Sequence, residues 1–219
     1  MKTHNLDISW WRTNFSEKEI NHVANSIRLQ YLSQGPITFE FEQQIGKILN
    51  VPYVIATTSG SAALLMALIS IGIKPGDEVI IPNRAWIAAA HAPLLLGAKV
   101  VMVDVEINRP NMNVNNIAKN ITPRTKAIIP VHLNGRSVNM EKLNNIAEKN
   151  NIVVIEDAAQ AFCSRNKKGF LGNQSSVGCF SLSMAKIIST AQGGFIITKK
   201  KRIYDKLKLI RTHGIRDHM

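Results

Sequence analysis

Lys186 is the only charged side chain in the stretch GCFSLSMAKIISTAQGG, residues 178–194. Burial among apolar side chains lowers the pKa of a lysine, because the ammonium form loses its solvation. The neutral amine is then a nucleophile, and its natural reaction is a Schiff base with a carbonyl compound. The alternative is a loop lysine that extends into solvent, and this stretch alone does not separate the two interpretations.

Asp157 follows the apolar run IVVIE and precedes AAQA. A carboxylate at the end of a buried strand is costly unless a cation or a hydrogen-bond donor compensates it. A protonated ring nitrogen, Mg²⁺ or an internal arginine would each serve as that partner.

Gly60 and Ser61 stand directly before an apolar helical run, AALLMALISIG. Free backbone N–H groups and the helix dipole at such a position form a seat for phosphate. The simpler interpretation is a serine N-cap with a turn glycine. Neither GKS/GKT nor GxGxxG follows, which argues against a Walker A loop and a nicotinamide-binding Rossmann motif. Trp86 is either a core residue or a stacking platform for an aromatic ligand.

Together these signals describe one ligand. It carries a phosphate, an aromatic ring, a ring nitrogen that requires an acid, and an aldehyde that requires an amine. Pyridoxal 5′-phosphate (PLP) has all four, and its enzymes use such a lysine together with an aspartate partner for the pyridinium nitrogen.

The elements that must position these residues alternate between apolar runs and helical patterns. We expect strands at 53–58, 74–82, 98–105, 125–133, 151–157, 176–183 and 193–200, and helices at 17–32, 38–49, 62–72, 86–96 and 139–150. The strand patterns are near-continuous hydrophobic runs, which predicts an α/β fold with a mostly parallel sheet and helices on both faces. Ligands of such sheets bind beyond the carboxyl ends of the strands, where the candidate residues lie.

The chain has two expected parts, an N-terminal arm and helix over residues 1–35 and a large domain over residues 36–219. Ser16 and Glu19 form a capping box at the start of the first helix. We interpret the Asn-rich segment 108–120 as a loop and short helix on the surface.

The composition limits the class of protein. The chain has 219 residues, 45% hydrophobic and 19% charged, with a net charge of +12. The basic run 199–202 opens a helix and has no interleaved aromatic side chains, so we expect a solvated helix face and no nucleic-acid binding. Cys163 and Cys179 form no metal-ligand pattern. No apolar run is long enough for a membrane span and no signal peptide is visible, so we expect a cytoplasmic protein with no membrane partner and no metal.

The ordered motifs GPITFEFE, TTSGSAAL, GDEVIIPNRAWIAAAH, AIIPVHLNG, VVIEDAAQA, CFSLSMAKIISTAQGGFIIT and IRTHG resemble the DegT/DnrJ/EryC1/StrS family. Its members are fold-type-I, PLP-dependent aminotransferases that act on nucleotide-linked keto-sugars. The resemblance runs from about Gly35 to Gly214.

The resemblance implies a role for each candidate residue. Lys186 corresponds to the Schiff-base lysine and Asp157 to the acid that pairs with the pyridinium nitrogen. Gln160 corresponds to the glutamine beside the cofactor, and Trp86 to the aromatic side chain stacked over its ring. The phosphate would be held by residues on two segments, namely Ser181 on one side and Gly60 and Ser61 on the other.

The sequence also departs from the family pattern. Gln192 replaces the usual acid of the GEGG or GDGG pair, Phe162 stands where histidine is frequent, and Arg84 where a small or polar residue is common. These departures concern the substrate pocket more than the cofactor site.

Family members usually continue beyond the RTHG motif into a small C-terminal domain, which this chain lacks. A truncated gene, a fragment or a natural short form would each explain the length. The resemblance implies amino transfer from an amino acid such as glutamate to a keto-sugar nucleotide, within amino-sugar or surface polysaccharide biosynthesis, and a homodimer for the full-length protein. The alternative is a catalytically inactive remnant that binds PLP or a partner.

Overall fold

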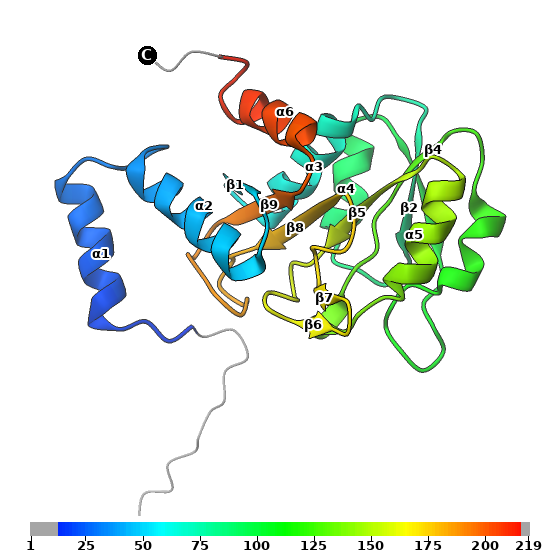
Figure 1. The fold of residues 1–219 in the computed structure, drawn as a ribbon, viewed down its shortest axis with the longest axis horizontal. Helices are drawn as coiled ribbons and strands as arrows, with labels where there is room; N and C mark the ends of the chain where they lie inside the picture. The colour runs from blue at the N-terminus through cyan, green and yellow to red at the C-terminus, as the bar shows by residue number, and fades with distance from the viewer. Residues whose placement is uncertain (1–12, 216–219) are drawn as a thin grey trace, which may run out of the picture.

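The computed structural model describes residues 13–215. Its helices are α1 (Glu17–Arg28), α2 (Pro36–Leu49), α3 (Gly60–Ile71), α4 (Ala88–Leu95), α5 (Met140–Lys149) and α6 (Lys201–Arg211). Its strands are β1 (Tyr53–Thr57), β2 (Glu78–Pro82), β3 (Lys99–Val103), β4 (Thr125–Ile128), β5 (Val153–Asp157), β6 (Arg165–Asn166), β7 (Gly169–Phe170), β8 (Val177–Ser181) and β9 (Gly194–Thr198). Figure 1 shows their arrangement.

Within the described residues, seven strands form one sheet in the order β1-β9-β8-β5-β4-β2-β3. The five strands β8, β5, β4, β2 and β3 are each parallel to their neighbours in this group. Strand β9 is antiparallel to both of its neighbours, β8 and β1. The predicted mostly parallel mixed sheet is therefore confirmed. Because β9 alone is reversed, the carboxyl ends of β1, β2, β5 and β8 meet at the same edge as the beginning of β9.

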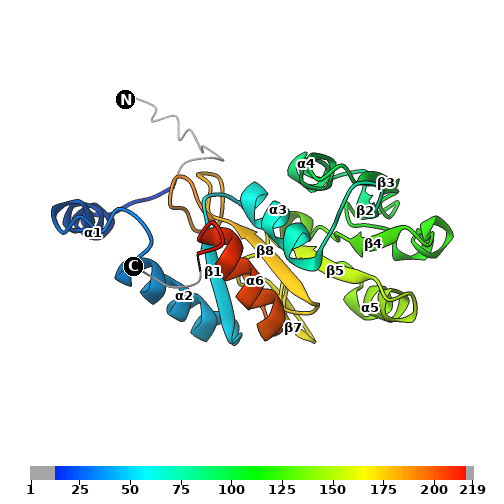
Figure 2. The same ribbon diagram turned by 90° about the horizontal axis from the view of Figure 1, so that it is seen from above.

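Helices cover both faces of this sheet, as Figure 2 shows for α3 and α4 on one face and α2 and α5 on the other. Ile81 and Ile155 pack with the face that carries α3, α4 and α6, while Ile80 and Val154 pack with α5 on the opposite face. Successive strand residues point to opposite faces, so strands buried on both sides are apolar throughout. This is why the sequence shows continuous runs rather than alternation.

The predicted boundaries shift where proline or local geometry intervenes. α2 begins at Pro36 rather than at Thr38, because proline is well suited to the first helical position, where its missing N–H is not needed. The strand expected at 125–133 ends at Ile128, and Pro130 and His132 continue beside β5 through backbone hydrogen bonds to Asp157. The short hairpin β6–β7 was not predicted.

The loop and short helix predicted for residues 108–120 are present, with helical turns at Val114–Asn116 and Ala118–Asn120, but the prediction that the segment lies on the surface was wrong for its larger apolar residues. Met112 and Ile117 are fully buried, and they pack in the same cluster as α5. The buried Asn111 side chain donates hydrogen bonds to the carbonyls of Val131 and Arg136. The segment's apolar side chains fill space beside the sheet, while its asparagines satisfy the irregular backbone.

α1 begins with the predicted capping box of Ser16 and Glu19, but it ends at Arg28 and not near residue 32. Gln30 has φ of 60°, which is incompatible with a continued right-handed helix. α1 has no buried residue, and its apolar side chains Ile20, Val23 and Ile27 are exposed. It lies apart from the sheet, beside α2 (Figures 1 and 2).

Candidate functional site

Two unused backbone N–H groups lie at the start of α3, at the carboxyl end of β1. Ser59 is the N-cap, and its Oγ accepts a hydrogen bond from the N–H of Ala62 at 3.0 Å. The carbonyl of Ser59 accepts from Ala63. The N–H groups of Gly60 and Ser61 therefore have no acceptor within residues 13–215. They lie at the positive end of the helix dipole, which is the geometry that binds phosphate.

Ser181 lies against this helix start because two glycines leave room for the approach. A Cβ built on Gly60 would lie 2.7 Å from Cβ of Ser181, and one built on Gly194 would lie 2.7 Å from the nitrogen of Gly60. Ser181 and Gly194 are register partners across β8 and β9. The structure thus brings Gly60, Ser61 and Ser181 together, and we call these three residues the phosphate cradle. Gly194 packs directly against it.

Asp157 is the last residue of β5 and lies at the same edge of the sheet. Its side chain belongs to the face covered by α3, since it follows Ile155 by two positions in the strand. The residue is 4% exposed, and its Oδ1 accepts a hydrogen bond from the N–H of Ala159 at 3.0 Å. Burial raises the pKa of Asp157, and the hydrogen bond from the N–H of Ala159 and the nearby charge of Lys186 oppose that rise only in part. Such a carboxylate favours a cationic or proton-donating partner.

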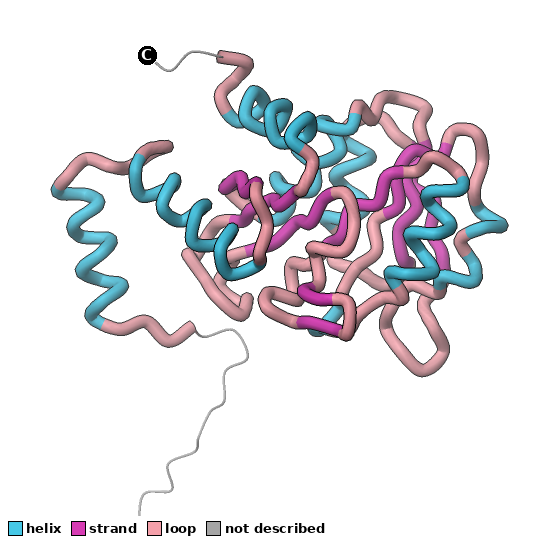
Figure 3. The backbone as a smooth tube through the Cα atoms, viewed as in Figure 1, coloured by secondary structure: helices cyan, strands magenta, loops and turns pink. Residues whose placement is uncertain are grey.

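Lys186 lies in the loop 182–193 that joins β8 to β9, drawn as loop in Figure 3. Its backbone N–H donates to the carbonyl of Ser183 at 3.0 Å, and its side chain is half-buried. Two apolar neighbours of Lys186 are exposed, Met184 by 54% and Ile187 by 62%, so this loop is not a closed apolar environment within the described residues. The hydroxyl of Thr13 donates to the carbonyl of Met184 at 2.7 Å, so the segment before α1 touches this loop.

Gln160 follows β5 in the turn after Asp157. Its Oε1 accepts a hydrogen bond from the backbone N–H of Asn134 at 2.9 Å. Asn134 has a left-handed backbone with φ of 53°, a conformation that asparagine tolerates. This bond fixes the amide of Gln160 so that its oxygen is occupied and its NH₂ group is left as a donor.

Trp86 is not a core residue, because it is 70% exposed. It lines a pocket of about 200 Å³ together with Ser61, Leu65 and His91, where the start of α3 faces the start of α4. The indole therefore lies next to the cradle residue Ser61, at the edge where a bound aromatic ligand would be covered.

Glu156, which precedes Asp157 in β5, and His132 beside it support the fold rather than the site. The N–H of Val138 donates to Nδ1 of His132, so Nε2 carries the proton and donates to Glu156 at 2.8 Å. The same carboxylate accepts from the N–H groups of Gly172 and Gln174. With both side chains fully buried, this group ties β5 to the loop before β8.

The residues present fit PLP on two observations. The cradle of Gly60, Ser61 and Ser181 offers two free N–H groups and a hydroxyl to a phosphate, in space that side chains at 60 and 194 would fill. Asp157 is a buried carboxyl group at the same edge, and because burial raises its pKa, a protonated ring nitrogen would compensate its charge. This sheet order, with a lysine-bearing loop between β8 and β9, is the α/β fold expected for the large domain of a fold-type-I PLP-dependent enzyme.

Comparison with known proteins narrows the class. The DegT/DnrJ/EryC1/StrS aminotransferase family matches residues 13–219. Protein MosB of Rhizobium meliloti is 40% identical over 175 residues, which are 80% of this chain and 34% of MosB.

Two solved structures share the fold. The PLP form of Spr1654 from Streptococcus pneumoniae has a TM-score of 0.90 and 28% identity, over 94% of this chain and 58% of that chain. Helicobacter pylori PseC, an aminotransferase involved in the biosynthesis of pseudoaminic acid, has a TM-score of 0.91 and 25% identity, over 96% of this chain and 57% of that chain.

The chain belongs to the DegT/DnrJ/EryC1/StrS aminotransferase family, and the cofactor of this class is PLP. It spans about a third of MosB and somewhat more than half of the solved relatives. No helix within the described residues is long and apolar enough to cross a membrane.

Sequence reasoning did not assign Gly194 to the site, and for Asn134, a polar candidate after a predicted strand, it predicted no contact with Gln160. Gly194 belongs to the quoted AQGG pattern, but its need for space depends on α3 lying directly above it. Asn134 directly follows the predicted strand 125–133, and its backbone contact with Gln160 depends on β4 and β5 being neighbours. A glycine pair at a strand start was the available signal for Gly194, and a polar residue directly after a predicted strand was the signal for Asn134.

Proposed function

We propose that this chain is the cofactor-binding part of a PLP-dependent aminotransferase that moves an amino group from an amino acid, such as glutamate, to a keto-sugar nucleotide. The observation that carries the proposal is the convergence of Lys186, Asp157 and the cradle of Gly60, Ser61 and Ser181 at one edge of the sheet. Family membership supports the reaction class.

The proposed roles follow from the position of each group. The N–H groups of Gly60 and Ser61 and the hydroxyl of Ser181 hold the phosphate. Asp157 holds a proton on the ring nitrogen, since a buried carboxylate is best compensated by a hydrogen-bond donor of positive charge. Trp86 covers one face of the ring, and the NH₂ group of Gln160 orients its edge.

When bound, PLP supplies the carbonyl that takes up an amino group and the ring that withdraws electrons from the adjacent carbon. Lys186 contributes the amine that holds this carbonyl in the resting protein. Once displaced, its Nζ takes the proton from the amino-acid Cα and returns it at the neighbouring position, as a general base and then a general acid.

We further propose the division into an arm and helix over residues 1–35 and a large domain over residues 36–219, supported by the absence of buried residues in α1. We also propose a homodimer, as the family resemblance implies, in which the partner subunit would cover the surface around the exposed Trp86. PseC, an aminotransferase of pseudoaminic acid biosynthesis, supports a sugar as the acceptor, in an amino-sugar or surface polysaccharide pathway.

Reduction with borohydride tests the assignment of Lys186. We expect the protein incubated with PLP to gain one covalent adduct, located on Lys186 by peptide mass spectrometry. Lys186→Ala should give no adduct, and Lys199→Ala, at an exposed lysine, should behave as the wild type. An adduct that persists in Lys186→Ala would refute the assignment.

Single-turnover assays then separate an enzyme from an inactive remnant. An active protein loaded with PLP converts glutamate to 2-oxoglutarate without an acceptor sugar, in an amount equal to the bound cofactor. A protein that forms the adduct but no keto acid would be a PLP-binding remnant, and the proposed activity of this chain would be wrong.

A further inference from the structure

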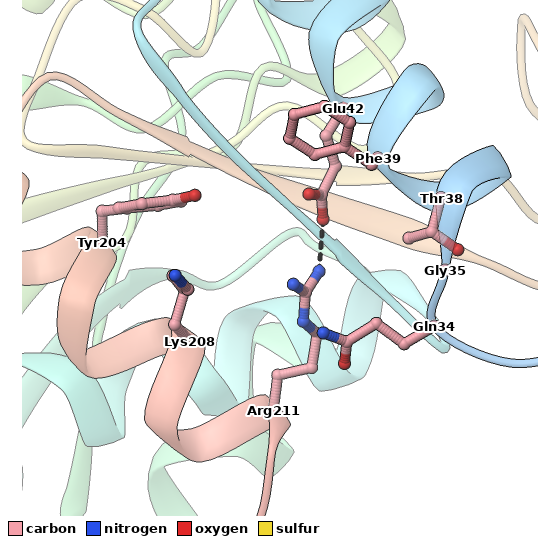
Figure 4. A pocket seen from close by; sticks show the side chains of 8 residues that line it. All are labelled: Gln34, Gly35, Thr38, Phe39, Glu42, Tyr204, Lys208 and Arg211. Atoms are coloured by element: carbon pink, nitrogen blue, oxygen red, sulfur yellow. Dashed lines mark hydrogen bonds and ion pairs between the residues drawn. The ribbon is translucent and has the colours of Figure 1, made fainter. Parts of the chain in front are cut away.

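Glu42 of α2 joins three elements that are distant in the sequence. Its Oε1 accepts a hydrogen bond from the backbone N–H of Ala56 in β1 at 2.7 Å. The same oxygen pairs with NH1 of Arg211 in α6. Figure 4 shows the carboxylate directed from α2 toward the guanidinium group, with Tyr204 and Lys208 of α6 beside them. Glu42 is 9% exposed, so this pair is largely shielded from water.

The hydrogen bond to Ala56 lies on the open edge of the sheet. β1 is the edge strand, paired only with β9 among the described strands. The outward N–H groups of an edge strand lack a strand partner, and Glu42 supplies an acceptor for one of them. The C-terminal half of β1 is therefore hydrogen-bonded on both sides, to β9 on one side and to the Glu42 side chain on the other.

The held part of β1 leads directly into the phosphate cradle. Thr57, next to Ala56, pairs with Gly194 in register, and its hydroxyl donates to the carbonyl of the N-cap Ser59 at 2.9 Å. Gly194 in turn lies against Ser59 and Gly60 so closely that an added Cβ would be 2.6 Å and 2.7 Å from their backbone atoms. If the backbone at Ala56 shifted, Thr57 would shift with it, and the N–H groups of Gly60 and Ser61 would move from their positions in the cradle.

Arg211 orients the carboxylate of Glu42. Its guanidinium NH1 is paired with Glu42, and its Nε is buried with no hydrogen-bond partner in the described residues. A buried carboxylate that lost this cation would be costly to keep in place. The cation therefore favours the orientation in which Oε1 can reach Ala56.

We propose that Glu42 is a positioning residue for the phosphate cradle, and that it raises affinity for the phosphate group of the cofactor without touching it. The inference rests on the proposed function, because it presupposes that PLP phosphate occupies the cradle. It assigns a functional effect to a side chain that lies on the outer edge of the sheet.

The test compares the affinities of PLP and pyridoxal, which lacks the phosphate, in the full chain by fluorescence titration. We expect Glu42→Ala to weaken PLP binding about tenfold, equivalent to roughly 1.4 kcal/mol, with pyridoxal affinity unchanged. Glu42→Gln should recover most of the PLP affinity, since its amide oxygen can still accept from Ala56. Equal losses for both ligands, or a loss for neither, would overturn the proposal.

Glu78 provides the matched control. It is also a buried glutamate paired with an arginine, Arg124, at 2.9 Å, but it is the first residue of the inner strand β2, at the strand end opposite to the cradle. Glu78→Ala should reduce stability as Glu42→Ala does, yet leave the ratio of PLP to pyridoxal affinity unchanged. A changed ratio in Glu78→Ala would mean that general destabilisation explains the effect, and the proposal would fail.

If Glu42→Ala does not fold, Glu42→Asp replaces it. Aspartate keeps the charge for Arg211 but is one methylene shorter, so its carboxylate falls short of Ala56, and we expect the phosphate-selective loss to remain. The experiment separates a failure of the proposed phosphate site from a failure of the proposed role of Glu42. Wild-type protein that binds PLP no better than pyridoxal would refute the phosphate cradle itself. A normal wild-type preference that survives in Glu42→Asp or Glu42→Ala would refute only the role of Glu42.

Discussion

Gly60 and Ser181 are in direct contact across the start of α3, since a Cβ built on Gly60 would lie 2.7 Å from Cβ and 3.2 Å from Oγ of Ser181. One residue comes from the segment after β1 and the other from the end of β8. Their contact requires β9 to lie between β1 and β8. Gly194 of β9 has no side chain, and this lets the backbone of Ser59 and Gly60 approach the strand closely. The phosphate cradle is thus a property of the strand order.

Gly60→Ala should weaken PLP binding by at least about tenfold, because the new methyl group displaces Ser181 or the helix start. Isothermal titration with PLP measures this loss. The matched control is Gly35→Ala, at the start of α2, where a Cβ has no neighbour within 4 Å. Wild-type affinity in Gly60→Ala would contradict the cradle geometry.

Ser181→Ala should lower PLP affinity about ten- to a hundredfold, since a hydrogen bond to a charged group contributes roughly 1.5–3 kcal/mol. Affinity for pyridoxal should not change. Ser70→Ala removes a buried hydroxyl from the last turn of α3, at the end opposite to the cradle, where it donates to the carbonyl of Ala67, and should leave PLP affinity intact. Comparable PLP losses in the two variants would argue against a direct phosphate contact by Ser181.

Asp157→Asn should stabilise the cofactor-free protein at neutral pH while impairing PLP binding. Burial raises the pKa of Asp157 in the folded state. The folded protein therefore holds this proton more tightly, and stability falls as pH rises from the unfolded pKa, about 3.9, through the folded one. Below both values the two states are equally protonated and this penalty disappears.

Urea unfolding of wild-type and Asp157→Asn protein between about pH 4 and pH 8 measures this effect. We expect the stabilisation by asparagine to grow as pH rises. Asp205→Asn, at an exposed aspartate paired with Lys201, serves as control and should not show that trend. A benefit of asparagine that is largest at low pH would contradict the assigned direction of the pKa shift.

Glu156→Gln should destabilise the fold by about 2–4 kcal/mol, because the amide NH₂ group must face backbone N–H donors in a buried site. The carboxylate currently accepts from His132, Gly172 and Gln174. Glu141→Gln, in an exposed pair with Lys168 at 3.8 Å, should change stability by less than about 0.5 kcal/mol. Urea unfolding distinguishes the two, and equal effects would mean that the buried network contributes no more than a surface pair.

The sequence by itself determined the elements and the kind of chemistry. Apolar runs marked every strand of the large sheet, the capping box marked the start of α1, and the lone Lys186 with Asp157 and Gly60-Ser61 indicated PLP. These signals are local, because helix caps, side-chain periodicity and glycine turns act within a few residues along the chain.

Only the tertiary structure decided which distant groups meet. The contact of Gly60 with Ser181, the bond from Asn134 to Gln160 and the bond from Ala56 to Glu42 all join separate elements. The burial of Met112 in an Asn-rich segment likewise depended on space beside α5. Such contacts follow from strand order and register, which hydrophobic patterning alone does not specify, because many orders bury the same runs equally well.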